Sequence, residues 1–262
     1  MKSQIFTITL LFILTLATAF IFIQTSEAAK IVAIWLLDEG KGKEIKDASG
    51  NGHTGEFFGN PEWTDGKLGK GIRFHGAPDH IEVPDPDHKL TPKHITMVCW
   101  LNLDNVSGNH SILEQYDWAG DLGTHAWRTN GVALQFYVIW GVTAPNANGG
   151  TLKEKEWMHV AATYNGADIK TWINGKVAAT ATGSRDLNPS DKSLSIGVRG
   201  DTKDVHWMQG VMDEIAIFDE ALTEKEIQDI MNSSKGLAGL YLAVNPEGKM
   251  ATTWSYIKSN EY

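Results

Sequence analysis

The stretch Glu156–Gly183, EWMHVAATYNGADIKTWINGKVAATATG, decides the fold of this chain. Its first segment alternates with the two-residue period of a β-strand. One face carries Trp157, His159, Ala161 and Thr163, and the other carries Met158, Val160, Ala162 and Tyr164. The pairs Asn165-Gly166 and Asn174-Gly175 interrupt the pattern, and Asn-Gly favours hairpin turns that need positive φ at both central residues. The stretch therefore predicts three consecutive antiparallel strands.

Both faces of this predicted meander carry apolar side chains, so both faces need cover. The pattern predicts the middle of a sheet within a packed sandwich. Further short segments of alternating or β-branched residues run from Ile31–Leu37 to Gly210–Phe218, with glycine-rich turns between them. Long helices do not alternate with these strands, which disfavours folds built on a parallel sheet. The sequence thus predicts an all-β protein with two stacked antiparallel sheets.

One short C-terminal helix is marked by its first residues. Thr223-Glu224-Lys225-Glu226 has the pattern of a capping box, in which the threonine hydroxyl and the third residue's carboxylate satisfy free backbone amides. Ile227, Ile230 and Met231 share the apolar face of this helix. The tail at residues 233–262 has weak periodicity and predicts no particular structure.

The N-terminus predicts export. Lys2 precedes an apolar run, Ile5–Ile23, and the small residues Ser26 and Ala28 follow. This order is typical of a secretory signal peptide at residues 1–28, cleaved after Ala28. The apolar run is also long enough to span a bilayer, so an uncleaved anchor is the alternative. We expect a secreted, periplasmic or cell-surface protein whose main domain occupies residues 29–232.

Charge and cysteine content narrow the possible partners. The formal net charge of -9 argues against nucleic acid and anionic membranes. Cys99 is the single cysteine and lies in an apolar strand-like run, so it cannot form an internal disulfide and is expected to be a buried thiol. Core packing or metal ions must therefore supply the stability that disulfides give many exported proteins.

Several segments in a fixed order carry a family resemblance. They are Trp35–Gly40, Asp47–Gly52, Gly69–Phe74, Asp79–Val83, Trp157–Tyr164, Trp172–Gly175 and Gly210–Thr223. Together they resemble the laminin G-like jelly-roll domains of the concanavalin A-like superfamily, in its bacterial secreted branch. The resemblance covers Ile31 to Met231. It implies two curved antiparallel sheets in jelly-roll order, whose concave face and rim loops bind sugars or proteins, commonly with calcium.

Four residues are candidate calcium ligands: Asp38, Asp47, Asn51 and Asp213. In the resembling family the first and last strands pair, which would bring Asp38 close to Asp213. A carboxylate in an apolar strand is costly to bury without compensation, and calcium binds several oxygen ligands. We expect a structural calcium at Asp38 and Asp213, with the Asp47/Asn51 turn as a weaker candidate. The alternative is that these side chains only bond backbone amides in turns.

Two groups of aromatic and polar residues are candidate ligand contacts. They are Tyr116, Asp117, Trp118, Asp121, His125, Trp127 and Arg128 in one predicted loop, and Asp204, His206 and Trp207 in a smaller group. Aromatic rings can pack against the apolar face of a sugar while acids and amides bond its hydroxyls. The alternative is that these rings are ordinary core or surface residues, since the chain holds ten tryptophans.

Catalytic signals are weak. Retaining glycosidases place two carboxylates about 5 Å apart, which a single strand achieves with alternating residues. The closest strand pair is Asp213-Glu214, and adjacent residues are expected on opposite faces. The sequence therefore predicts a secreted, non-catalytic, calcium-stabilised module that binds a glycan or an extracellular protein. The alternatives are a polysaccharide-cleaving enzyme and a structural or adhesive cell-surface protein.

Overall fold

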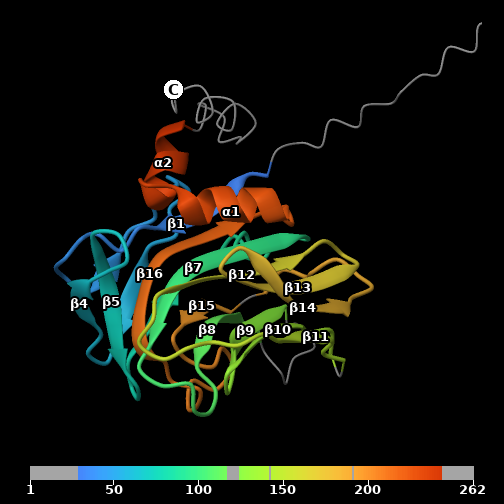
Figure 1. Cartoon of the computed structure of the whole chain (residues 1–262), viewed down its shortest axis with the longest axis horizontal. Helices are drawn as coiled ribbons and strands as arrows, with labels where there is room; N and C mark the ends of the chain where they lie inside the picture. The colour runs from blue at the N-terminus through green and yellow to red at the C-terminus, as the bar shows by residue number, and fades with distance from the viewer. Residues whose placement is uncertain (1–28, 117–123, 142, 191, 244–262) are drawn as a thin grey trace, which may run out of the picture.

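The computed structural model describes residues 29–116, 124–141, 143–190 and 192–243. Two antiparallel sheets of eight strands each pack face to face (Figure 1). The upper sheet has the order β14 (Lys176–Thr182), β13 (Asp168–Ile173), β12 (Met158–Tyr164), β7 (Ile95–Leu103), β16 (Gln209–Phe218), β5 (Lys70–His75) and β4 (Glu62–Asp65), and β1 (Ile31–Trp35) also pairs with β16. The lower sheet has the order β11 (Asn146–Gly149), β10 (Ala133–Val138), β9 (His125–Asn130), β8 (Ser111–Gln115), β15 (Leu194–Ile196), β6 (His80–Val83), β3 (Gly55–Phe58) and β2 (Glu44–Ile45). The predicted all-β sandwich of two antiparallel sheets is confirmed.

The main core lies between the two sheets. It is built from alternate residues of the facing strands, such as Leu134, Phe136 and Val138 of β10. Cys99 of β7 belongs to this core as a free, fully buried thiol, as predicted. Burial raises the pKa of the Cys99 thiol, which keeps it in the unreactive protonated form.

The predicted meander is present as β12, β13 and β14. The face of β12 formed by Met158, Val160, Ala162 and Tyr164 points into the core. The expected position in the middle of a sheet holds for β12 but is wrong for β14, which forms an edge. That strand carries mostly small side chains, and Val177 on it is 46% exposed. An exposed strand of this kind is suited to a sheet edge rather than to its interior.

The two Asn-Gly turns of the meander differ. Asn174 and Gly175 both have positive φ, at 49° and 71°, and join β13 to β14 in the predicted two-residue turn. The first turn is one residue longer, because Ala167 also belongs to it. There the side-chain oxygen of Asn165 accepts hydrogen bonds from the amides of Ala167 and Asp168, at 3.0 and 2.6 Å. The two-residue form expected at Asn165 is therefore wrong.

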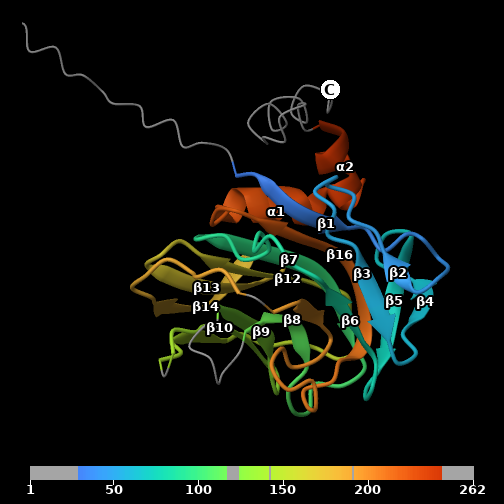
Figure 2. The same ribbon diagram turned by 180° about the vertical axis from the view of Figure 1, so that it is seen from behind.

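The outer face of the upper sheet is covered by α1 (Glu224–Asn232), as Figures 1 and 2 show. The predicted capping box is confirmed: the Thr223 hydroxyl accepts from the Glu226 amide, and the Thr223 amide donates to the Glu226 carboxylate. Ile227 and Ile230 of α1 join a second hydrophobic cluster on this face. The helix thus supplies the cover that the meander's outer face required.

A second helix, α2 (Gly236–Ala243), follows α1 in the tail for which the sequence predicted no structure. Its residues GLAGLYLA are apolar all round, so no amphipathic period marked it. Leu237 and Leu240 are buried in the cluster under α1. Neither described helix has the length and apolar character needed to cross a membrane. The predicted signal peptide, residues 1–28, lies outside the described residues.

A β-bulge in β16 changes the direction of two acidic side chains. The pairing of β16 with β7 shifts register between Asp213 and Ala216, and Glu214 has a φ of 51°. Met212 and Ile215 both belong to the main core, so Asp213 and Glu214 between them both point outward. The expectation that these adjacent residues lie on opposite faces is wrong, because the bulge adds a residue to the strand.

Candidate functional site

One register row crosses the lower sheet from β3 to β11. Each member of the row is the direct cross-strand partner of the next. The members are Glu56, Glu82, Ser195, Glu114, Ala126, Tyr137 and Asn146. Residues paired in this way share one side of a sheet, and the adjacent Leu113, Trp127 and Phe136 face the core. The row therefore marks the outer side of the lower sheet, which we call the polar face (strands β3, β6 and β8–β10 in Figure 2).

Glu114 lies fully buried at the centre of the polar face. One carboxylate oxygen accepts a hydrogen bond from the Ser111 hydroxyl at 2.7 Å, and the other accepts from the Gly200 amide at 3.1 Å. Burial raises the pKa of the Glu114 carboxyl above its ordinary value, against the opposing effects of Ser111 and Arg128. Beside it in the row, the buried Ser195 hydroxyl finds no hydrogen-bond partner among the described residues.

Arg128 lies next to Glu114 and is held by uncharged neighbours. Its guanidinium carbon is 4.7 Å from the ring centroid of Tyr137, and Nη1 is 3.2 Å from Nδ1 of His206. Burial, together with the charges of Arg128 and Arg199, lowers the pKa of His206 to about 4. The imidazole is therefore neutral at pH 7 and can accept a hydrogen bond from the guanidinium.

Arg199 forms the second basic centre of the polar face. Its guanidinium contacts Asp201 through two nitrogens, with N···O distances of 2.6 and 2.9 Å. Its Nε also donates to the hydroxyl of Tyr116 at 3.0 Å. Two parallel bonds to one carboxylate fix the plane of an arginine, so Arg199 holds Tyr116 and Asp201 in place at the end of β8.

Three aromatic rings adjoin these polar groups. Phe58, which is 42% exposed, stacks on its cross-strand partner His80 with ring centroids 4.9 Å apart and planes 19° apart. His80 in turn meets Trp207 edge to face at 5.8 Å. Since Trp207 follows His206 in the chain, these rings continue directly from the cluster around Arg128. We call Phe58, His80 and Trp207 the aromatic trio.

The structure brings together some of the predicted ligand residues. Tyr116, His206 and Trp207 all contribute to the polar face, although Tyr116 is about 90 residues from the other two in the sequence. Trp127 does not, because strand alternation turns its ring into the core, where it is fully buried. The expected ligand contact of Trp127 is therefore wrong. Asp117, Trp118 and Asp121 lie outside the described residues.

The two main calcium candidates bind the same turn. The pairing of β1 with β16, expected from the resemblance, is present. Asp38 accepts a hydrogen bond from the Lys70 amide at 2.7 Å, and Asp213 accepts from the Leu68 amide at 2.9 Å. Leu68 lies in the turn between β4 and β5, and Lys70 is the first residue of β5. A Cβ on Gly66, in the same turn, would lie 2.6 Å from the Asp213 carboxylate. Glycine at this position allows the acid to approach the turn.

The bulged acids carry strongly shifted pKa values. Burial raises the pKa of Asp213 to about 8, and the charge of Glu214 adds to the shift. Burial likewise raises the pKa of Glu214 to about 7, with a further contribution from Asp38. No group of three or more His, Cys, Asp or Glu side chains in the described parts of the chain is arranged to hold a metal ion. Calcium at these acids stays a prediction.

Asp47 and Asn51, the weaker calcium candidates, tie a turn to β1. The Asp47 carboxylate accepts hydrogen bonds from the amides of Ile34 and His53, both at 3.1 Å. The Asn51 amide donates to the backbone oxygen of Val32 at 2.9 Å. This is the geometry of the turn-forming alternative, in which the polar side chains bond nearby backbone.

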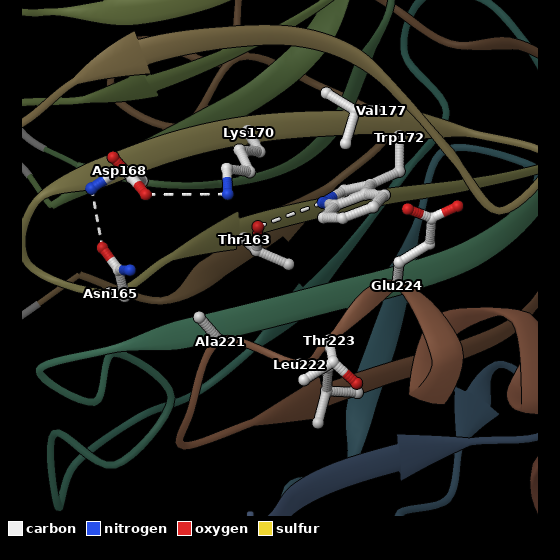
Figure 3. Close-up of a pocket in the computed structure, with 10 residues that line it drawn as sticks. All are labelled: Thr163, Asn165, Asp168, Lys170, Trp172, Val177, Ala221, Leu222, Thr223 and Glu224. Atoms are coloured by element: carbon white, nitrogen blue, oxygen red, sulfur yellow. Dashed lines mark hydrogen bonds and ion pairs between the residues drawn. The ribbon is translucent and has the colours of Figure 1, made fainter.

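A pocket of about 380 Å³ lies on the opposite side of the sandwich, between the β12–β14 hairpins and the start of α1 (Figure 3). Its polar groups partner one another. The Trp172 indole donates to the Thr163 hydroxyl at 3.0 Å, and the Lys170 amine is 3.6 Å from the Asp168 carboxylate. Trp172 is only 4% exposed, so its ring offers little surface to a ligand. The candidate ligand residues of the sequence do not line this pocket.

Comparisons with known proteins agree with this architecture. A family model described as the concanavalin A-like lectin/glucanases superfamily matches residues 75–228. No curated protein sequence matches the chain. Domain 4 of AbnA, an extracellular arabinanase from Geobacillus stearothermophilus solved with arabinotriose, is 19% identical with a TM-score of 0.62, and the match covers 78% of this chain and 98% of that domain.

Two toxin binding domains are also similar in structure. The binding domain of Paraclostridial Mosquitocidal Protein 1 is 17% identical with a TM-score of 0.63, covering 78% of this chain and 52% of that one. The binding domain of botulinum neurotoxin serotype C1 is 14% identical with a TM-score of 0.64, again covering 78% and 52%. This chain therefore spans about half of each toxin domain. At these identities the likeness shows a common fold.

Proposed function

Because the chain belongs to the concanavalin A-like lectin/glucanase superfamily, we propose that it is a non-catalytic module that binds a glycan on its polar face. One observation carries the proposal: the aromatic trio and the hydrogen-bonding cluster around Arg128 lie side by side on one side of the lower sheet. A sugar ring needs both, since its C–H face is apolar and its hydroxyls are polar.

The aromatic trio would supply the apolar contact. The side chain of Phe58 is largely exposed. Its ring is held in place by stacking on His80 of the neighbouring strand, so its position does not depend on a loop. Two rings on paired strands lose little conformational freedom on binding, which favours affinity. Polar partners for the hydroxyls lie further along the same face, where the Gln135 amide donates to the Asn146 side chain at 3.1 Å.

The acids of this face support binding rather than bond cleavage. Both oxygens of Glu114 already accept hydrogen bonds inside the protein. Glu82 contacts His80 at 3.3 Å and Lys203 at 3.5 Å. A glycosidase needs one carboxyl positioned to protonate the leaving group and a second to act as nucleophile or base. Glu114 and Glu82 are already engaged by partners within the protein, which supports a binding role for this face.

We also propose that calcium stabilises the domain at Asp38 and Asp213, with the Asp47/Asn51 turn as the weaker candidate. The support is that Asp213 is fully buried and that burial, with the charge of Glu214, raises its pKa although it accepts from the amides of Leu68 and Glu214. A bound cation would favour the ionised form of Asp213. The same proposal includes export to the cell surface or beyond, where calcium is abundant. The support for export is the signal-peptide pattern of residues 1–28.

A glycan array probed with the purified protein, with and without calcium, tests the function. Trp207→Ala and Phe58→Ala should lose most binding while melting near the wild-type temperature. Val177→Ala is the matched control, since Val177 is an exposed apolar residue on the upper sheet. If wild-type protein binds no glycan at millimolar concentration, an extracellular protein becomes the better partner. Cleavage of a bound polysaccharide would instead favour the enzyme alternative.

A further inference from the structure

The basic side chains of the polar face differ in how their charges are neutralised. Arg199 contacts Asp201 at 2.6 Å. Lys203 lies 3.5 Å from Glu82, and a hydrogen bond from His80 lowers the pKa of that carboxyl, so it is ionised at pH 7. Arg128 is the exception. In the described residues, a single carboxylate lies within ion-pair distance of it.

That carboxylate is Glu114, and it is poorly placed to neutralise Arg128. The distance from Nη1 of Arg128 to the nearer Glu114 oxygen is 3.9 Å, which is too long for a hydrogen bond. Both Glu114 oxygens accept from Ser111 and Gly200 instead. Burial also raises the pKa of Glu114, which favours its neutral form. Among the described residues, Arg128 therefore has no closely bound carboxylate to neutralise its charge.

The surroundings of Arg128 increase the cost of that charge. Its side chain is only 15% exposed. Its contacts are the neutral His206 imidazole, the Gln135 amide oxygen at 3.5 Å and the Tyr137 ring. A largely buried cation without an anion is unfavourable. Arg128 donates hydrogen bonds through Nε and Nη1, and within the described part of the chain Nη2 has no acceptor.

We propose that the glycan bound on the polar face carries a carboxylate, as a uronic acid does, and that the guanidinium of Arg128 binds it. This inference rests on the proposed function and names its ligand class. A planar carboxylate matches the fork of guanidinium donors, and bonds between charged partners are stronger than neutral ones. The neutral contacts orient the guanidinium, and the ligand completes its charge balance. The aromatic trio then receives the sugar ring or its neighbour.

The first experiment uses wild-type protein. Oligogalacturonate and other acidic oligosaccharides are titrated beside their carboxyl-reduced counterparts, which keep the ring but lose the charge. The acidic form should bind about tenfold to a hundredfold tighter, and added salt should reduce the difference. Equal affinity for both forms, or preference for sulfated or neutral glycans, would overturn this inference and leave the proposed function intact. Binding to no glycan would overturn both.

The second experiment uses matched variants. Arg128→Gln should reduce affinity for the acidic oligosaccharide to that of its reduced form, while Arg128→Lys should keep part of the preference. Lys203→Gln removes the same charge from the same face but should change affinity little, because Lys203 already pairs with Glu82. Equal losses in the Arg128 and Lys203 variants would overturn the assignment by showing only a long-range charge effect. Melting curves show whether each variant is folded. The wild-type titration tests the inference even if a variant does not fold.

Discussion

The guanidinium carbon of Arg128 lies 4.7 Å from the ring centroid of Tyr137, across the pair of strands β9 and β10. The ring of Tyr137 thus supports the cation from one side, while Nη1 contacts His206. A cation on an aromatic face gains about 0.5–2 kcal/mol, depending on burial. Tyr137 is therefore a positioning residue for Arg128 on the polar face.

Replacing Tyr137 tests this role. Tyr137→Leu should lower the free energy of unfolding by about 1 kcal/mol and weaken binding of an acidic oligosaccharide several-fold, because Arg128 loses its support. Tyr137→Phe keeps the ring and should behave like wild type. Urea denaturation and calorimetric titration measure the two effects. If the leucine and phenylalanine variants bind alike, the ring does not position the guanidinium.

The sequence predicts the same role for Trp127 and Trp207, but replacing them should have opposite effects on stability and on glycan binding. Trp127 is fully buried in the core, so Trp127→Ala should cost about 3–5 kcal/mol of stability. Trp207 lies on the polar face and is partly exposed, so Trp207→Ala should cost far less stability but most of the glycan affinity. Denaturant unfolding and binding are measured on both variants. A Trp207 variant that melts early yet binds normally would contradict the assignment of the aromatic trio.

The calcium proposal predicts a stabilising metal effect. Chelation should lower the melting temperature, by about 2–4 °C for each kcal/mol of binding free energy lost. Asp213→Asn should abolish this response, because it removes a proposed ligand while keeping a side chain of similar shape. Asp47→Asn is the comparison variant for the weaker candidate. Differential scanning calorimetry measures the melting temperatures. A melting temperature that chelation does not change would contradict the calcium proposal.

Two buried histidines should each contribute a loss of stability in acid. Burial lowers the pKa of His125 and of His159 from 6.5 to about 3. Between these values the unfolded chain binds more protons than the folded one. The contribution of each histidine to stability is therefore fully present above pH 6.5 and is lost as pH drops toward 3, by about 1.4 kcal/mol per pH unit. The raised pKa values of Asp213 and Glu214 act in the opposite direction over the same range.

The matched variant for this pH dependence is His125→Gln, which has no titrating group. Its unfolding free energy, measured in urea from pH 7.5 to pH 4.5, should fall less steeply than that of wild type. The comparison of slopes separates this effect from any constant cost of the substitution. Parallel curves for the two proteins would show that His125 does not titrate on unfolding.

Much of the fold followed from local pattern. Three features are determined by residues close together in the sequence, and all three are present. They are the alternation in β12, the Asn174-Gly175 turn and the Thr223 capping box. The β16 bulge could not be foreseen in this way. It depends on how β16 pairs with β7, and a one-residue shift turned Glu214 to the same face as Asp213.

The candidate site was only partly predictable for the same reason. Composition drew attention to Tyr116, His206 and Trp207, and the structure places all three on the polar face. Glu114 and Arg199 were missed because nothing near them in sequence marks them. The role of Glu114 comes from its place in a register row across several strands, and that of Arg199 from its contacts with Asp201 and Tyr116. Only the alternation around Trp127 could have shown that Arg128 faces outward.

The central claim is that the polar face binds a glycan without cutting it. Its most direct test is calorimetric titration of the wild-type protein and of Trp207→Ala with the best glycan from an array, followed by product analysis of the mixture. The account predicts saturable binding to wild type, at least about tenfold weaker binding to the variant, and intact glycan afterwards. Equal binding by both proteins, or release of shorter oligosaccharides, would contradict it.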